Sequence, residues 1–173
     1  VDAPVAQAIW EITSSLPKVH GRIQNIPNTL PVLVAIGTAT LWLAYATLSG
    51  RKGMEPHTGF LKVAAVAIPA AYLAKVFLQD AFGRTNTRFW LKTGGPIEFR
   101  WFHPIQNGGF PSGHSLVFTA FLAAVWIYYP RSRPLAVVAV AALGSALLLT
   151  SYHFVSDIIS GIMCGIYITA AIH

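Results

Sequence analysis

The sequence predicts an all-α integral membrane protein, a bundle of about five transmembrane helices preceded by an amphipathic interfacial helix. Hydrophobic residues make up 54% of the 173 residues and charged residues only 10%, against roughly 25% charged residues in a typical soluble domain. Five apolar runs approach or nearly reach the ~20 residues that cross a bilayer as a helix. The alternative, a soluble helical bundle, would need polar helix faces that these runs lack.

The segment 1–28 has the pattern of a helix that lies on the membrane rather than across it. Val5, Ile9, Ile12 and Leu16 recur at three- and four-residue spacing, with polar residues elsewhere on the helix. This spacing places the four apolar side chains on one helical face. Such a helix lies in the plane of the membrane interface.

The five predicted spans follow in order: 29–49, 58–81, 112–129, 134–152 and 155–172. Most connections between them are short and contain Gly, Pro or Ser, as turns do. The connection 82–111 is about thirty residues long, which is well beyond the usual length and makes it a candidate active-site loop. No internal repeat interrupts the chain, so we expect one membrane-embedded domain over residues 1–173.

The alternation of spans predicts which polar residues share a side of the membrane. Arg84 after the second span, His114 at the start of the third, and His153 with Asp157 at the start of the fifth would meet at one bilayer surface. Short loops on the opposite side carry basic residues, which favours a cytoplasmic location for that side. We therefore expect an inner or plasma membrane protein whose polar site faces the periplasm or exterior.

The net charge of +6 and the single cysteine limit the possible partners. Lys and Arg occur in short clusters between apolar runs rather than along one helical stripe, so nucleic-acid binding is not expected. Anionic lipid headgroups or a phosphorylated substrate explain them better. Cys164 lies alone in an apolar run, so neither an intramolecular disulfide nor a thiol pair for a metal is expected.

His153 and Asp157 are four residues apart at the start of a predicted helix. Their side chains therefore project from one face and can approach each other. A carboxylate that fixes one imidazole nitrogen leaves the other free to act as nucleophile or base. An ordinary interfacial helix start, where Asp suits the helix dipole, is an equally good interpretation of these two residues alone.

The segment 110–114, Phe-Pro-Ser-Gly-His, precedes a long apolar helix. Pro suits the first helical turn, and the free backbone amides of a helix start can bind an anion. A plain loop-to-helix junction is the alternative, because Ser-Gly is common in turns. His114 favours a functional site, since it adds a second imidazole to the membrane face of His153. Two His, one Asp and a helix N-terminus are the groups needed for displacement at phosphorus.

The residues at 111–114 and His153-Phe-Val-Ser-Asp157 resemble the second and third motifs of the type 2 phosphatidic acid phosphatase superfamily. This superfamily also includes vanadium haloperoxidases and sphingolipid phosphotransferases. Phe82-Gly83-Arg84-Thr85 resembles the stretch around its first motif, and the likeness covers roughly residues 75–161. Pro-Ser-Gly-His alone is a weak signal, but followed by His-x-x-x-Asp about forty residues later it is specific.

The resemblance implies a mechanism without metal or other cofactor. His153 would attack phosphorus to form a phosphohistidine, Asp157 would hold its ring, and His114 would protonate the leaving oxygen. Ser112 and the Gly113 amide would bind phosphoryl oxygens. The implied substrate is a phospholipid or other phosphorylated lipid, whose phosphate lies at the membrane surface while its tails lie among the helices.

Three cations of the family pattern are missing from this chain. The family's Lys and Arg-Pro in the first motif correspond here to Gln79, Asn86 and Thr87, and the third-motif Arg corresponds to Leu147. We expect Arg84, with Arg88, to bind the phosphate, because a guanidinium suits phosphate geometry. Further candidates are Lys75, for which snorkelling is the more favoured interpretation, and Lys92 and Arg100, which equally suit headgroup contacts.

The missing cations leave competing hypotheses. A lipid phosphatase or phosphotransferase is the first, and a phosphodiester substrate is favoured because it carries one negative charge rather than two. A non-catalytic membrane subunit or lipid-binding scaffold is the second, although retention of both histidines and the aspartate argues against it. A small transporter ranks last, because only Lys62 and Lys75 lie within spans, both near their ends.

Overall fold

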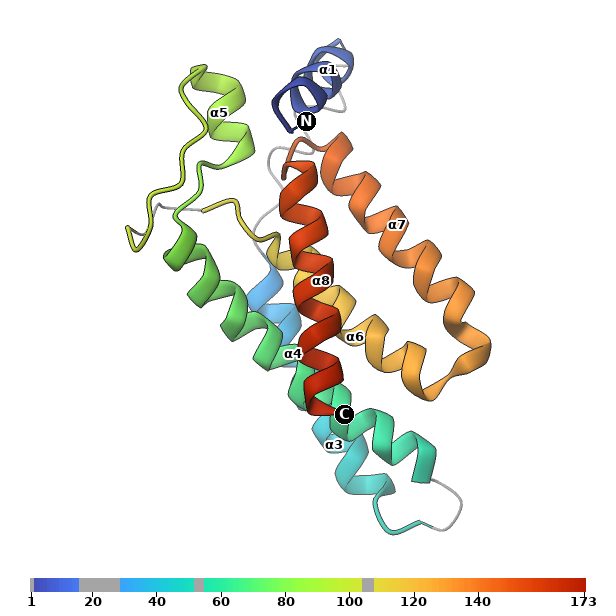
Figure 1. The fold of residues 1–173 in the computed structure, drawn as a ribbon. Coiled ribbons are helices and arrows are strands. Elements are labelled where there is room, and N and C mark those ends of the chain that lie inside the picture. The colour runs from blue at the N-terminus through green and yellow to red at the C-terminus, as the bar shows by residue number, and fades with distance from the viewer. Residues whose placement is uncertain (1, 16–28, 52–54, 104–107) are drawn as a thin grey trace.

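The computed structural model describes residues 2–15, 29–51, 55–103 and 108–173. Figure 1 shows a bundle of helices. The helices are α1 (Asp2–Ser14), α3 (Leu30–Leu48), α4 (Glu55–Phe82), α5 (Thr87–Thr93), α6 (Gly113–Tyr128), the short 3-10 helix η1 (Pro130–Ser132), α7 (Arg133–Leu149) and α8 (Val155–Ile172). Within these ranges, extended pairing is limited to one isolated bridge between Arg84 and Phe99.

Four helical stretches are long and apolar enough to cross a membrane: α3, α4, η1 with α7, and α8. α6 is a shorter apolar helix and packs against both α4 and α8. Together they match the five predicted runs, which confirms the predicted all-α membrane bundle. α4 is the longest of them, at 28 residues, or about 42 Å at 1.5 Å per residue.

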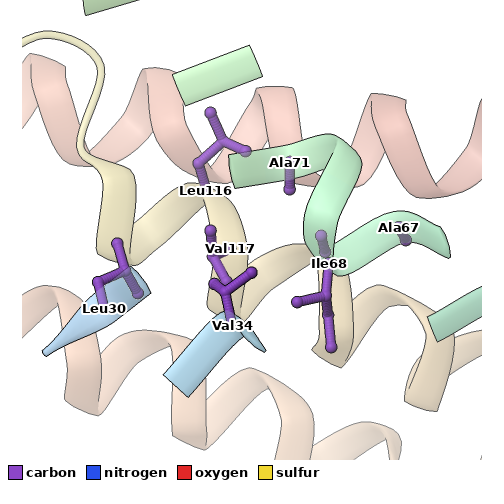
Figure 2. Packing of buried hydrophobic residues seen from close by; sticks show 8 residues of the cluster. Leu30, Val34, Ala67, Ile68, Ala71, Leu116 and Val117 are labelled. Carbon is purple, nitrogen blue, oxygen red and sulfur yellow. The ribbon is translucent and has the colours of Figure 1, made fainter. Parts of the chain in front are cut away.

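Large apolar side chains on the outer faces of the spans are exposed, among them Ile36, Leu43, Leu73 and Leu135. An apolar surface of this kind is unfavourable in water and suits contact with lipid. The interior instead contains small residues. In Figure 2, Leu30 and Val34 of α3 face α4 and α6, where several contacting residues are alanines: Ala67, Ala71 and Ala120.

The helices α6 and α8 approach each other closely through two glycines of α8 that lie one turn apart. A Cβ atom at Gly161 would lie 2.6 Å from the Ser112 carbonyl oxygen, and one at Gly165 would lie 2.5 Å from that of Leu116. Only glycine permits this approach, as in the small-residue interfaces of other membrane helices. The Thr169 hydroxyl adds a hydrogen bond of 2.9 Å to the Ala120 carbonyl. The starts of α6 and α8 are thereby held side by side.

At each end of the bundle, the helix ends that meet are those that the alternation of spans predicts. The end of α4 and the starts of α6 and α8 meet at one end, where Arg84 and the Ser112 amide both bond to Asp157. At the other end, His57 near the start of α4 contacts the Tyr129 hydroxyl after α6 at 2.9 Å. Which end faces the cytoplasm remains a prediction.

The N-terminal helix α1 lies at the end of the bundle where α8 begins (Figure 1). It contacts α5, α7 and α8, and Ala6 is its one buried hydrophobic residue. Residues 16–28 of the predicted interfacial segment and residues 104–107 of the predicted active-site loop lie outside the described residues. The interfacial position of α1 and the single-domain organisation remain predictions.

We expect Gly161→Ala to lower the free energy of unfolding by about 1–3 kcal/mol, because its Cβ would displace the α6 backbone. Gly37→Ala in α3 is the matched control, since a Cβ there meets nothing within 4 Å. This control should be neutral or slightly stabilising, as alanine favours helices over glycine. Thermal unfolding midpoints in detergent measure both effects, and equal midpoints for the two variants would contradict the close contact.

Candidate active site

The first turn of α6 presents free backbone N–H groups. The Ser112 hydroxyl caps the helix by accepting from the Ser115 amide at 3.3 Å, and the Ser112 amide donates to the Asp157 carbonyl at 2.9 Å. In the described part of the chain no acceptor bonds to the amides of Gly113 and His114, as is normal for the first helical turn. These two amides are suited to bind an anion.

The imidazole of His153 is buried and has one fixed nitrogen. Its Nδ1 lies 3.0 Å from the carbonyl oxygen of Gly109. A carbonyl only accepts hydrogen bonds, so Nδ1 carries the proton and Nε2 carries the lone pair when the ring is neutral. The ring therefore presents a nucleophilic nitrogen at Nε2, and the Gly109 carbonyl sets its orientation.

The carboxylate of Asp157 is fully buried at the start of α8. One oxygen accepts from the Phe154 amide at 3.0 Å and lies 3.6 Å from His153 Nδ1. This distance is long for a hydrogen bond, so Asp157 acts on the ring mainly as a nearby negative charge. The closer orienting contact of His153 is the Gly109 carbonyl.

The guanidinium of Arg84 is buried, with 4% of the residue exposed. One terminal nitrogen donates to Asp157 and to the Ser156 hydroxyl, and the other pairs with Asp2 at 2.8 Å. Aromatic rings surround the group, the nearest being Phe154, whose ring centre lies 4.6 Å away. These contacts direct Arg84 towards two carboxylates and do not support the expected phosphate contact. A phosphate-binding role for Arg84 stays an untested prediction.

Tyr152 lies between the two histidines. Its ring centre is 5.6 Å from that of His114 and 5.3 Å from that of His153. The guanidinium of Arg88 stacks on the same tyrosine at 4.4 Å and donates to the Thr150 carbonyl at 3.2 Å. The structure thus brings His114, His153 and Arg88 around one tyrosine at one end of the bundle, and the alternation of spans predicts this meeting for the two histidines.

At the positions where the family pattern has cations, this chain has neutral residues that make structural contacts. Gln79 donates to the Pro111 carbonyl at 3.0 Å and so holds the start of α6. Asn86 caps α5 by accepting from the amides of Arg88 and Phe89. Leu147 is buried in α7. The neutral side chains therefore stabilise the loop and helix starts around the histidines.

Lys75 lies one helical turn before Gln79 on the same face of α4. Its methylene chain packs on the start of α6, because a Cβ at Gly113 would lie 2.8 Å from Lys75 Cγ. Its ammonium is 5.6 Å from the centre of the Tyr72 ring. Within the described ranges it forms no salt bridge, although the Asp80 carboxylate interacts with it electrostatically. Both Lys75 and His153 interact electrostatically with His114. Lys75 therefore lies within the candidate site, whereas the sequence alone favours its interpretation as a snorkelling lysine.

Four further residues contribute to the candidate site without a recognisable signal in the sequence: Gly109, Tyr152, Ser156 and Asp2. Gly109 contributes a backbone carbonyl, which no side-chain pattern reveals, and a Cβ there would crowd the Thr85 carbonyl at 3.2 Å. Asp2 is distant in sequence from every motif. Among the described residues, no group of three His, Cys, Asp or Glu is placed to hold a metal ion.

We expect Arg84→Gln to lower the free energy of unfolding by about 3–5 kcal/mol, because it leaves the buried Asp157 charge without its cation. Arg100→Gln is the matched control in the same loop, where the ion pair with Glu98 is exposed and contributes less than about 1 kcal/mol. Chemical denaturation in detergent compares the two variants. A loss for Arg84→Gln no greater than that of the control would contradict the buried pair.

The family model that matches this chain is described as the PAP2 superfamily, and it covers residues 60–173. This range is about two thirds of the chain and contains both histidines, Asp157 and the loop that carries Arg84. Comparisons with curated proteins and with solved structures found no match. The matched range includes α6 and α8, whose starts carry the Pro-Ser-Gly-His and His-x-x-x-Asp residues. The chain therefore belongs to the PAP2 superfamily.

Proposed function

We propose that this protein is a membrane enzyme that cleaves or transfers a phosphoryl-containing group of a lipid through a phosphohistidine at His153. The observation that carries the proposal is the hydrogen bond from His153 Nδ1 to the Gly109 carbonyl, because it leaves Nε2 as the nucleophile. Membership of the PAP2 superfamily, whose members are generally phosphatases, supports the same reaction class.

In the first step the Nε2 lone pair forms a bond to phosphorus and the bond to the leaving oxygen breaks. The ring becomes positively charged, since Nδ1 keeps its proton. The nearby Asp157 carboxylate, 3.6 Å from Nδ1, and the Gly109 carbonyl both stabilise this charge. Asp157 thus lowers the barrier by its charge, without accepting the proton.

His114, starting as the imidazolium, donates a proton to the leaving oxygen. It then, as a neutral base, accepts one from water or an acceptor alcohol and so returns to the imidazolium. The incoming oxygen bonds to phosphorus, the N–P bond breaks, and His153 regains its lone pair. The amides of Gly113 and His114 bind the phosphoryl oxygens during both steps. Ser112 supports them as the cap of α6, since its hydroxyl bonds to Ser115.

The charges around the histidines favour a phosphodiester over a phosphomonoester. Arg84 pairs with two carboxylates, while Lys75 lies beside Gly113 and Arg88 beside Tyr152. Binding a dianion in a partly dry site requires more positive charge than binding a monoanion. We therefore propose a singly charged lipid phosphodiester as the substrate.

The apolar outer faces of the spans support access of the lipid tails from the bilayer. The phosphate would then enter at the end of the bundle where α6 and α8 begin. By the distribution of basic loops, this end would face the periplasm or exterior of an inner or plasma membrane. A non-catalytic scaffold is the alternative, and the neutral residues at the family's cation positions favour it.

We expect His153→Gln to reduce turnover of dioleoyl phosphatidylglycerol in detergent micelles by about a thousandfold or more, because it removes the nucleophile. His103→Gln is the control, since this histidine is exposed at the same end of the bundle and has no role in the mechanism. Released headgroup phosphate is measured by mass spectrometry. Equal rates for the parent and His153→Gln would favour the scaffold.

We expect Lys75→Met to lower kcat/KM by about 10- to 100-fold, because a charged hydrogen bond to the phosphoryl group is lost. Lys62→Met on the same helix is the matched control, because Lys62 is exposed. The parent should also turn over dioleoyl phosphatidylglycerol faster than dioleoyl phosphatidic acid. Preference for the monoester would refute the phosphodiester assignment.

A further inference from the structure

The N-terminal helix reaches the catalytic carboxylate through one buried arginine. Asp2 at the start of α1 pairs with Arg84 at 2.8 Å, and Arg84 pairs with Asp157, whose other oxygen lies 3.6 Å from His153. Four side chains from three distant parts of the sequence thus form a continuous chain of polar contacts. Its outer end lies on α1 and its inner end is the proposed nucleophile.

Asp2 is bonded to α8 as well as to Arg84. One carboxylate oxygen accepts from the Ser156 amide at 3.1 Å, and the other accepts from the Ser156 hydroxyl. Burial by itself raises the pKa of Asp2, but the hydrogen bonds from Ser156 and Arg84 outweigh it and hold the pKa below its ordinary value. The carboxylate is therefore ionised at neutral pH and remains a partner for the guanidinium.

These contacts attach the start of α1 to α8 and Arg84, in addition to its packing against α5 and α7. The helix has one buried hydrophobic residue, Ala6, and exposes Ile12. An acidic residue in the first turn usually serves the dipole of its own helix. Asp2 instead directs its side chain to the first turn of α8 and to the arginine behind the active site.

Arg84 needs both of its carboxylates to keep its position. Its Nε atom has no hydrogen-bond partner among the described residues, and the residue is 4% exposed. Without Asp2, the second terminal nitrogen would also lose its acceptor. A buried guanidinium with two bare nitrogens is unfavourable, so it would turn or admit water, and Asp157 would move with it.

We propose that Asp2 is a positioning residue of the active site, so that docking of α1 fixes Arg84 and Asp157 in the geometry that His153 requires. The inference rests on the proposed function for its catalytic consequence. Asp2 touches neither substrate nor nucleophile, so its loss should lower kcat while leaving the KM of the lipid nearly unchanged.

The first measurement follows amide hydrogen exchange of α1 and the start of α8 by mass spectrometry, and it needs no substrate. Asp2→Asn should lose protection in both segments, whereas Asp2→Glu, which keeps the charge, should retain most of it. Glu11→Gln is the matched control, because it removes one negative charge from an exposed position of the same helix. It should exchange like the parent.

The second measurement compares turnover of dioleoyl phosphatidylglycerol by the same variants. We expect kcat to fall about tenfold in Asp2→Asn with KM changed by less than about twofold, and to recover in Asp2→Glu. If amide hydrogen exchange in Asp2→Asn equals that of the parent, Asp2 does not hold α1 on the bundle and the proposal is overturned. If α1 loses protection from exchange in Asp2→Asn while kcat stays unchanged, the role of Asp2 in catalysis is overturned.

Failure of the proposed function gives a different pattern. If the parent and His153→Gln are equally inactive, the proposed function is overturned and the catalytic role of Asp2 with it. The hydrogen-exchange comparison still decides whether Asp2 holds α1 through Arg84, since that contact does not depend on chemistry.

Discussion

The site depends on the backbone contact between α6 and α8. Gly161 and Gly165 let the two helices approach until an added Cβ would lie within 2.6 Å of carbonyl oxygens of α6. At this separation the Ser112 amide bonds directly to the Asp157 carbonyl. The starts of both helices, and with them His114 and His153, are then placed together at one end of the bundle. Small residues, rather than large apolar ones, thus determine the geometry of the candidate site.

Around the starts of α5 and α6 this chain has neutral side chains at positions where the family pattern has cations. Gln79 and Asn86 use neutral hydrogen bonds to hold the starts of α6 and α5. The two terminal nitrogens of Arg84 pair with Asp2 and Asp157. In the proposed function, positive charge for the substrate is supplied by Lys75, one turn before Gln79 on α4, and by Arg88 on Tyr152. A site with fewer cations suits a less charged phosphate.

The sequence allows prediction of the fold and of which residues meet, because hydropathy marks the spans and their alternation fixes the ends. It also identifies His114, His153 and Asp157, whose spacing suits one helix face and one helix start. It does not reveal the Gly109 carbonyl, because backbone acceptors are independent of side-chain type. Nor does it reveal the partners of Arg84, since Asp2 is brought near by tertiary packing of α1. From the sequence alone Lys75 is interpreted as a snorkelling residue. Only the structure shows that its side chain packs beside Gly113.

The position of the phosphoryl group on the trapped intermediate tests the central claim most directly. After rapid quenching of the enzyme with a phosphodiester lipid, NMR of the isolated peptide containing His153 distinguishes an Nε2 adduct from an Nδ1 adduct. Because Nδ1 donates to the Gly109 carbonyl, we predict phosphorylation at Nε2. A phosphoryl group on Nδ1 of His153, or on His114, would contradict it.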